Sequence, residues 1–354
     1  MGTNGAASSK NGKNSASPAV SGSTKASHIF LRDVSVGMTF EGVYQVLGVQ
    51  EKLARNNSVY SDLTLADKTS RQYVRIWKTA ASTIVQKGNY ARIEAHVDEY
   101  MGKPQIIANT VVKVEQPTPE EMAEFFVPTM PDREDDLKKF NELVEFVNSL
   151  CKTSQDHTCT LVLQHILTPE TMAALKDAPG SAKPCYGAVG GALARASRVG
   201  MVTRSLCSRY KLDILEAAIA VTGALIHSVG SIKAFGFEGS TAIETKHGTL
   251  FGQGFLTSVQ VANAVKAVSI QADAWPDTCE RLAHAVASAW WCGPKPMTKE
   301  AVVLNAAMRS DYDAAQAVDF IDGDLGSDDD FTAYDQSTKR RFYRPKPREI
   351  GENS

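Results

Sequence analysis

The chain has 354 residues and a formal net charge of −2, with 43% hydrophobic and 22% charged residues. Because a typical domain has about 100–200 residues, this length predicts two domains, each large enough to bury a core. No apolar run approaches the roughly 18 residues that a membrane span needs, so we expect a soluble globular protein with no membrane partner.

Residues 1–27 mix Ser, Gly, Asn and Ala with three lysines and no acidic residue. They contain no basic and apolar leader, and this composition predicts a disordered tail. The rest of the charge is unevenly distributed: residues 28–117 hold 11 basic and 9 acidic residues, whereas residues 118–354 hold 24 and 31. The N-terminal third is therefore the cationic end, which permits phosphate binding without demonstrating it.

Residues 28–117 contain segments with the alternating or β-branched character of strands. The expected strands are Thr39–Gln50, Val59–Leu65, Gln72–Trp77, Tyr90–Glu99 and Gln105–Val114. Turn signals separate them, and Thr79–Val85 is expected to form a short helix at one barrel end. Three strands, a helix and two strands follow the order of the OB-fold, so we predict a five-stranded OB-fold barrel.

Helical periodicity begins after the predicted linker Gln116–Pro119. The expected helices are Glu120–Phe126, Asp135–Leu150, Gly190–Tyr210, Leu212–Val229, Gly254–Ala272, Thr278–Trp291 and Lys299–Phe320. We therefore predict an all-α domain over residues 118–320, followed by a charged C-terminal tail at 321–354. The fold class is α+β with two domains.

The six cysteines are scattered without the spacing of a zinc site or a disulfide framework. This pattern favours a reducing, cytoplasmic location. No motif calls for a cofactor, and we expect none.

The predicted barrel carries aromatic and basic side chains suited to single strands, because every base can stack on an aromatic ring and every phosphate attracts a cation. The candidates are Tyr44, Lys52, Arg55, Tyr60, Arg71, Tyr73, Arg75, Trp77, Lys78, Tyr100 and Lys103. Tyr73, Arg75 and Trp77 share one face of their strand by the period of two. The alternative for Trp77 is that it covers the barrel core. Arg55 lies in the first hairpin loop, where OB-folds commonly contact ligands.

The segment from Asp62 to Thr69, followed by Val74–Trp77, resembles the OB-fold of YhaM-type 3′-to-5′ exoribonucleases. Further landmarks follow in that family's order. They are Ala178-Pro179, Gly190-Gly191, His227 with Gly230, Gly293–Pro296 and Arg341–Pro345. The resemblance covers roughly residues 28–348. It implies that the helical domain is similar to HD-type phosphohydrolases, which hold divalent metal with histidines and aspartates.

Most positions that the resemblance assigns to metal ligands carry other residues here. Arg195 replaces the first histidine, and Ser228 replaces the aspartate that follows the retained His227. Gln253, Trp290 and Trp291 stand where further histidines are expected, while Asp311 or Asp313 aligns with the last ligand. Arginine cannot ligate a metal, and metal-dependent hydrolysis needs a full ligand set. We therefore expect a helical domain without a metal or catalytic residues.

Four other features allow more than one interpretation. Arg195 is expected either to hold a phosphate or to form a structural salt bridge, and Trp290-Trp291 either to stack on a ligand or to pack in the core. The glycines Gly190-Gly191 favour close helix packing over a phosphate cradle. The acidic stretch Asp319–Asp335 is expected to be a solvated loop, with a nucleic-acid mimic or a contact for a basic protein partner as the alternative.

These observations predict a non-catalytic protein that binds single-stranded DNA or RNA. A role in phage or mobile-element DNA metabolism would suit such a protein, and we also expect it to be able to form homo-oligomers. A first alternative is a metal-dependent 3′-to-5′ exonuclease that uses His227, His247, His284, Asp311 and Asp313. A second is a scaffold or regulator that binds another protein.

Overall fold

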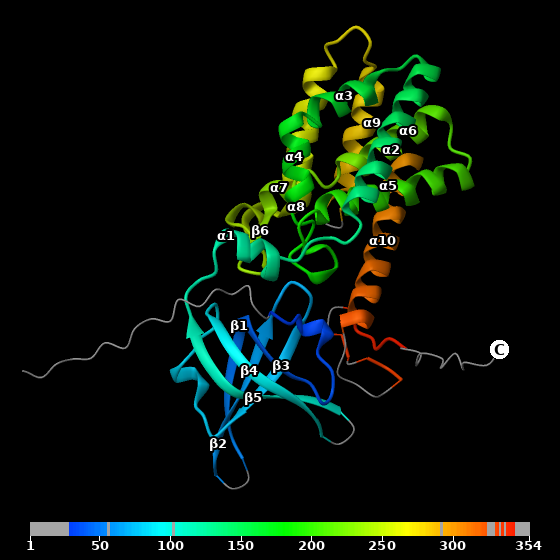
Figure 1. The fold of residues 1–354 in the computed structure, drawn as a ribbon. Helices are drawn as coiled ribbons and strands as arrows, with labels where there is room; N and C mark the ends of the chain where they lie inside the picture. Colours follow the sequence, from blue (N-terminus) through cyan, green and yellow to red (C-terminus); the bar gives the residue numbers. More distant parts are fainter. Residues whose placement is uncertain are drawn as a thin grey trace, which may run out of the picture.

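The computed structural model describes residues 28–54, 57–100, 103–290, 293–323, 330–332, 334–335 and 338–343. The predicted tail 1–27 lies outside the described residues, as do residues 324–329 and 344–354 of the charged C-terminal segment. Figure 1 shows a β-barrel at the N-terminal end of the described chain and a larger helical domain beyond it.

The barrel is closed, with strand order β1-β2-β3-β5-β4 and β4 paired back to β1. Its strands are β1 (Thr39–Leu53), β2 (Val59–Ala66), β3 (Arg71–Trp77), β4 (Tyr90–Tyr100) and β5 (Lys103–Val114). All neighbours are antiparallel except β3 and β5, which run parallel. This is the strand order of an OB-fold, and the prediction of a five-stranded barrel is confirmed.

Alternation along the strands builds the barrel core. Leu63, Leu65, Val74 and Ile93 are among the buried residues of one hydrophobic cluster, while Thr64, Tyr73 and Arg92 beside them are more exposed. The predicted helix between β3 and β4 is one 3-10 turn, η3 (Ala81–Thr83). Another short 3-10 turn, η2 (Leu31–Asp33), precedes β1.

A short helical connection covers one end of the barrel. It consists of α1 (Pro119–Glu121), which begins with a capping box between Thr118 and Glu121, and a π-helical turn, η4 (Met122–Phe126). Phe126 is fully buried against Tyr90 and Val43 of the barrel. The connection is thus part of the barrel's packing as well as the link to the helical domain.

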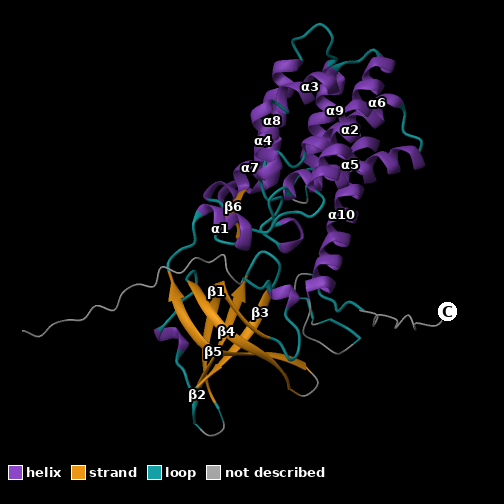
Figure 2. Cartoon of the chain, in the orientation of Figure 1, coloured by secondary structure: helices purple, strands orange, loops and turns teal. Residues whose placement is uncertain are grey.

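The helical domain contains more elements than the sequence predicted. Its described elements are α2 (Arg133–Ser154), α3 (Thr158–Ile166), α4 (Pro169–Asp177), η5 (Pro184–Tyr186), α5 (Gly191–Arg209), α6 (Ile214–Ile226), α7 (Ser231–Ala234), β6 (Phe235–Glu238), β7 (Thr241–Glu244), α8 (Lys246–Val268), α9 (Pro276–Ser288) and α10 (Lys299–Gly323). The helices α3 and α4 and the hairpin β6–β7 were not predicted, so the domain is mainly but not entirely helical (Figure 2).

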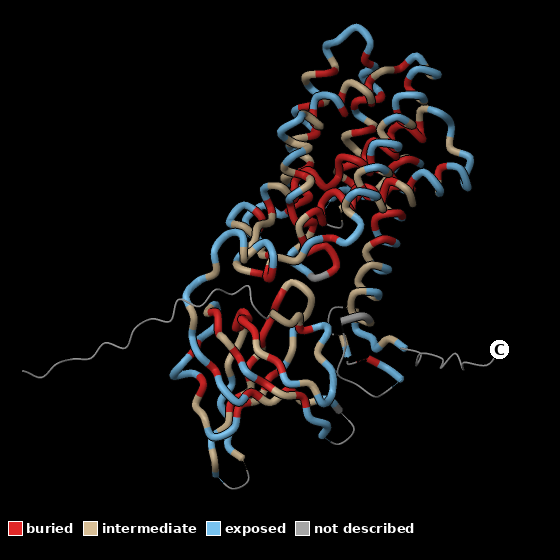
Figure 3. The backbone as a smooth tube through the Cα atoms, in the orientation of Figure 1, coloured by how far each residue is buried: buried red, intermediate tan, exposed pale blue. Residues whose placement is uncertain are grey.

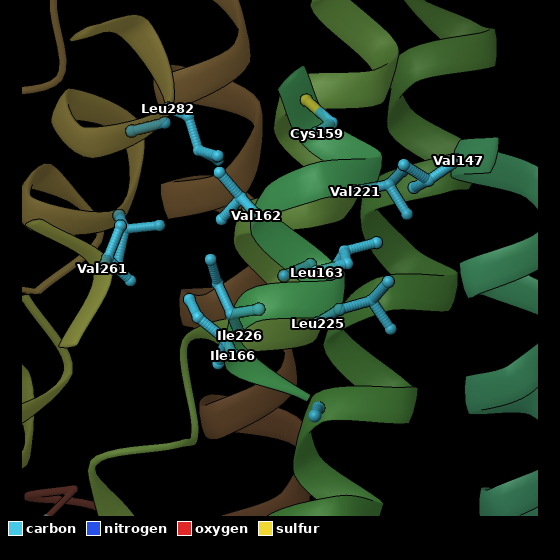
Figure 4. Packing of buried hydrophobic residues seen from close by; sticks show 14 of the residues in the cluster. Val147, Cys159, Val162, Leu163, Ile166, Val221, Leu225, Ile226, Val261 and Leu282 are labelled. Atoms are coloured by element: carbon cyan, nitrogen blue, oxygen red, sulfur yellow. The ribbon is translucent and has the colours of Figure 1, made fainter. Parts of the chain in front are cut away.

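The helix α6 is buried along nearly its whole length, from Glu216 to Ile226, and buried residues concentrate in the interior of this domain (Figure 3). Val221, Leu225 and Ile226 of α6 pack with Leu163 of α3 in the largest hydrophobic cluster (Figure 4). The expectation that no apolar run reaches membrane length was wrong, because Ile214–Ala234 is long and apolar enough to do so. Of its most apolar window 89% is buried inside the protein, as in a core helix.

The hairpin β6–β7 joins the helical domain to the barrel. At its turn, the backbone N–H and the hydroxyl of Ser240 both donate to the side-chain Oε1 of Gln45 in β1, with a distance of 3.0 Å from the backbone nitrogen. Gly239 has a φ of +60°, and a Cβ there would lie 2.1 Å from Gln45 Nε2. Only glycine therefore allows this approach without a rearrangement.

Candidate nucleic-acid interface and the helical-domain cluster

The outer face of β2 and β3 presents a row of aromatic and charged side chains. Tyr60 pairs with Trp77, and Asp62 pairs with Arg75, in the antiparallel register of the two strands. Because side chains alternate across a strand, all four project from the barrel rather than into it. The shared face predicted for Tyr73, Arg75 and Trp77 is confirmed by the inward burial of Val74 and Ile76 between them.

Arg75 packs against two aromatic rings on this face that also contact each other. Its guanidinium carbon lies 4.6 Å from the ring centroid of Tyr60 and 5.3 Å from that of Trp77. The two rings are 5.1 Å apart and tilted by 41°. Trp77 is 42% exposed, so the alternative that it covers the barrel core was wrong. The three side chains form a surface on which a base can stack.

Asp62 holds the cations of this face in place. Its carboxylate accepts hydrogen bonds from Arg75 Nε at 2.8 Å, Arg75 Nη2 at 3.1 Å and Lys52 Nζ at 2.9 Å. Partial burial opposes ionisation of Asp62, but the bonds from Arg75 and Lys52 outweigh it and lower the pKa of the carboxyl. The face therefore has one acidic residue between two basic ones, a feature that the sequence analysis did not single out.

Other predicted barrel residues surround this stack. Tyr73 is 79% exposed and Tyr100 63% exposed, and Arg71 and Lys78 are also exposed at the ends of β3. Lys78 has a φ of +55°, which is unusual for a residue with a side chain. Lys103 begins β5, but its side chain is not described, and Arg55 lies outside the described residues.

The prediction that Tyr44 belongs to the interface was wrong. The residue is fully buried, and its hydroxyl donates to the carbonyl of Ile29 at 2.7 Å. Burial raises the pKa of this phenol well above its usual value. The adjacent Val43 is buried too, against Phe125 and Phe126, so both faces of β1 are covered at this point. Tyr44 is thus a core residue and cannot stack on a base.

In the helical domain, predicted positions from four helices and their ends lie in one buried polar cluster. Arg195 of α5 lies 5.4 Å from the ring centroid of Trp290, which follows α9, and His227 lies 6.1 Å from the same ring. Arg195 Nη1 also donates to Gln253 Oε1 of α8 at 3.4 Å. Trp291 lies outside the described residues.

His227 and Ser228 are fully buried, and their side chains are hydrogen-bonded to each other. His227 Nδ1 lies 2.6 Å from the carbonyl of Ala224, so it carries the proton and donates, and Ser228 Oγ donates to Nε2 at 3.1 Å. Both ring nitrogens are thereby occupied.

Asp311 of α10 belongs to the cluster, whereas Asp313 is exposed. Tyr186, which was not predicted as a site residue, donates its hydroxyl to both carboxylate oxygens of Asp311, at 2.9 and 3.0 Å. Burial raises the pKa of this carboxyl. The cluster therefore couples η5 to α10.

The residues of the cluster do not fit the divalent metal that the family resemblance implies. Arg195 has no lone pair to offer, and the His227 nitrogens are engaged by Ala224 and Ser228. Among the described residues, no three His, Cys, Asp or Glu side chains lie together in a metal-binding arrangement. A hydrolytic step through a metal has no support in this geometry.

Because His227 is buried, we expect the stability of the fold to depend on pH. Burial and the nearby charge of Arg195 lower its pKa to about 3, against an ordinary value of about 6.5. Between these values the unfolded chain binds a proton that the folded chain excludes, so stability is complete above pH 6.5 and falls as the pH is lowered. We expect this group alone to cost about 1.4 kcal/mol per pH unit well below pH 6.5.

Urea unfolding at pH 6.5 and 5 checks this prediction. His227→Gln should show a shallower loss of stability than the wild type, and the exposed His165→Gln should match the wild type. Equal pH dependence in all three proteins would contradict the buried, neutral imidazole.

No family model and no curated protein matches the chain. Among solved structures, it is similar to the second OB-fold domain of replication protein A from Methanococcus maripaludis, with 16% identity and a TM-score of 0.22 over 26% of this chain and 98% of that chain. A TM-score this low supports no inference, so the assignment of the barrel rests on its own strand order.

Proposed function

We propose that the chain binds single-stranded nucleic acid across the outer face of β2 and β3. The observation that carries the proposal is the stack of Tyr60, Arg75 and Trp77 on the outer face of the barrel, in which Trp77 is exposed and the other two are half-buried. Three aromatic or guanidinium planes on one rigid sheet offer stacking to any base, and stacking contributes about 1–3 kcal/mol per base. Tyr73 and Tyr100 extend this aromatic surface, and Arg71 and Lys78 add cations at its ends.

The proposed interface predicts a preference for single strands over duplex. In a duplex the faces of the bases are already stacked on one another, so a flat aromatic surface gains little from them. Among the described residues, this face consists of strands and carries no recognition helix that could enter a groove of duplex DNA. DNA and RNA both satisfy this chemistry.

Fluorescence anisotropy with labelled single-stranded DNA, single-stranded RNA and duplex tests the proposal. Single strands of mixed sequence should bind with weak sequence preference, and their affinity should fall steeply from 50 to 200 mM salt as phosphate contacts are screened. A preference for duplex would contradict the proposal. Degradation of the strands with Mn²⁺, lost in His227→Ala, would favour the exonuclease alternative, and no binding of any oligonucleotide at low salt would favour a protein-binding scaffold.

Neutralising Asp62 is expected to strengthen the binding of single strands rather than weaken it. Asp62→Asn removes the negative charge between Arg75 and Lys52 but keeps the shape of the side chain. A partly exposed ion pair contributes only about 0–1 kcal/mol, so the loss of orientation should be small. The two released cations should instead strengthen binding several-fold at low salt and steepen the salt dependence by about one phosphate contact.

The same anisotropy titrations measure this effect. Asp98→Asn, which removes an exposed carboxylate from β4, is the matched control and should leave the salt dependence nearly unchanged. Weaker binding by Asp62→Asn with an unchanged salt slope would instead assign Asp62 the task of positioning Arg75 over the rings.

We also infer that the helical domain is a degenerate HD-like domain. Support comes from the convergence of Arg195, His227, Gln253, Trp290 and Asp311, which the family resemblance selects from segments far apart in the sequence. Residues that occupy one site in an ancestral fold stay together when the ligand set is lost. A cytoplasmic, non-catalytic role agrees with this inference.

A further inference from the structure

Arg195 carries a positive charge into the helical domain without a carboxylate in direct contact with it among the described residues. The residue is only 7% exposed. Its guanidinium makes two hydrogen bonds, from Nη1 to the carbonyl of Gly180 and to Gln253 Oε1, and both are long at 3.4 Å. Among the described residues, no carboxylate lies within ion-pair distance of it. Buried charges without a partner are costly, and proteins rarely retain them unless they bind something.

Two buried donors of this region also lack acceptors. The Nε of Arg195 and the indole Nε1 of Trp290 are both buried and have no hydrogen-bond partner. They belong to side chains in contact, since the guanidinium carbon lies 5.4 Å from the indole ring. Buried donors are nearly always satisfied in native proteins, so two unpartnered donors on side chains in contact indicate a missing acceptor.

Aromatic rings around Arg195 stabilise its positive charge but offer no acceptor to the two unpartnered N–H groups. The ring of Tyr186 lies 5.9 Å away on another side, and the aromatic faces of Tyr186 and Trp290 partly replace water around the guanidinium. Asp311 attracts Arg195 at longer range, but this one carboxylate also faces Arg198, so it cannot balance both cations. Trp290 is only half-buried, which brings the cluster to the surface of the domain.

We propose that Arg195 and Trp290 form a binding site for a phosphate group in the helical domain, separate from the proposed interface on the barrel. A guanidinium donates in a planar fork that matches two oxygens of a phosphate, and the indole N–H supplies a third donor. A bound oxyanion would satisfy Nε of Arg195 and Nε1 of Trp290 together and would balance the buried charge. The phosphate can be free or carried by a mononucleotide, which the experiment separates.

The test is the melting temperature of the full chain at constant ionic strength, titrated with inorganic phosphate, AMP or acetate. Phosphate or AMP should raise the melting temperature saturably, by roughly 5–10 °C at about a hundred-fold excess over Kd. Acetate should have little effect. A lower midpoint for AMP than for phosphate would identify a nucleotide as the ligand, and equal midpoints would identify phosphate alone.

Two variants of Arg195 and one control make the result specific. Arg195→Met should abolish the phosphate response and raise the melting temperature in the absence of oxyanion, because an unbalanced buried charge has been replaced by an apolar side chain of similar length. Arg195→Lys retains the charge without the fork, so it should fold and respond with at least a ten-fold weaker midpoint, a difference of about 1.4 kcal/mol. Arg209→Met, at the exposed end of α5, should behave as the wild type.

The proposal is overturned if neither phosphate nor AMP shifts the wild-type melting temperature, or if acetate is as effective as phosphate. It is also overturned if Arg195→Lys folds and responds to phosphate like the wild type, whatever the stability of Arg195→Met. In those cases Arg195 is a structural cation held by Tyr186 and Trp290.

Discussion

Trp77→Ala is expected to weaken binding of a mixed-sequence single strand about 5- to 150-fold, the equivalent of about 1–3 kcal/mol for one stacked base. Trp77 provides the largest ring of the stack, and its exposed face is the one available to a base. Tyr60→Ala should have an effect in the same range. Because both rings contact Arg75, the double variant should lose less than the sum of the two single losses.

Matched variants separate the loss of a ring from the loss of a fold. Tyr60→Phe keeps the ring and should bind nearly as the wild type, and Tyr210→Ala removes an exposed tyrosine from the helical domain and should have no effect. Circular dichroism melts of each variant confirm folding. If Trp77→Ala is folded and binds with wild-type affinity, the face of β2 and β3 is not the interface.

Gly191→Ala is expected to cause the largest loss of stability among simple substitutions near the helical-domain cluster. A Cβ at this position would lie 2.1 Å from the carbonyl oxygen of Tyr186 and 2.9 Å from the backbone nitrogen of Gly180. These atoms are themselves hydrogen-bonded to each other, so neither can move alone. We expect a loss at or above the upper end of the roughly 1–3 kcal/mol that overpacking costs.

Gly236→Ala is the control for this prediction, since its added Cβ would meet only a methyl group of Thr245 at 3.6 Å, an ordinary contact. Urea unfolding of both variants measures the difference. A loss below about 1 kcal/mol for Gly191→Ala would show that the loop before α5 can yield, contrary to close packing around the glycine.

The barrel could be predicted almost completely from the sequence, because the physical signal is local. Alternation in β3 placed Val74 and Ile76 inside and Arg75 and Trp77 outside, and the strand ends differed from the expected ones by at most three residues. The prediction for Tyr44 was wrong although the same local signal was present. Tyr44 shares the inward face of β1 with Phe40 and Val46, and all three belong to the barrel core.

The helical domain was predicted less well. The helices α3 and α4 have nine residues each, which is too short for periodicity to distinguish them from loops. The only sequence signal for α4 is Thr168 and Pro169 at its N-terminus. The hairpin β6–β7 has four-residue strands and was overlooked for the same reason. Tyr186 and Asp62 were missed as site residues because their importance depends on partners, Asp311 and Arg75, that only the folded chain brings near.

The contact between Gln45 and Ser240 has a consequence for biosynthesis. All strands of the barrel precede residue 115, so the barrel can close on the ribosome long before Ser240, which follows Gln45 by 195 residues, is made. At roughly 5–20 residues per second, the delay between the end of β5 and Ser240 is about 6–25 s. During that time the future junction presents an amide that water can solvate, in place of an apolar patch that would invite aggregation, and the growing chain can wait safely for its second domain.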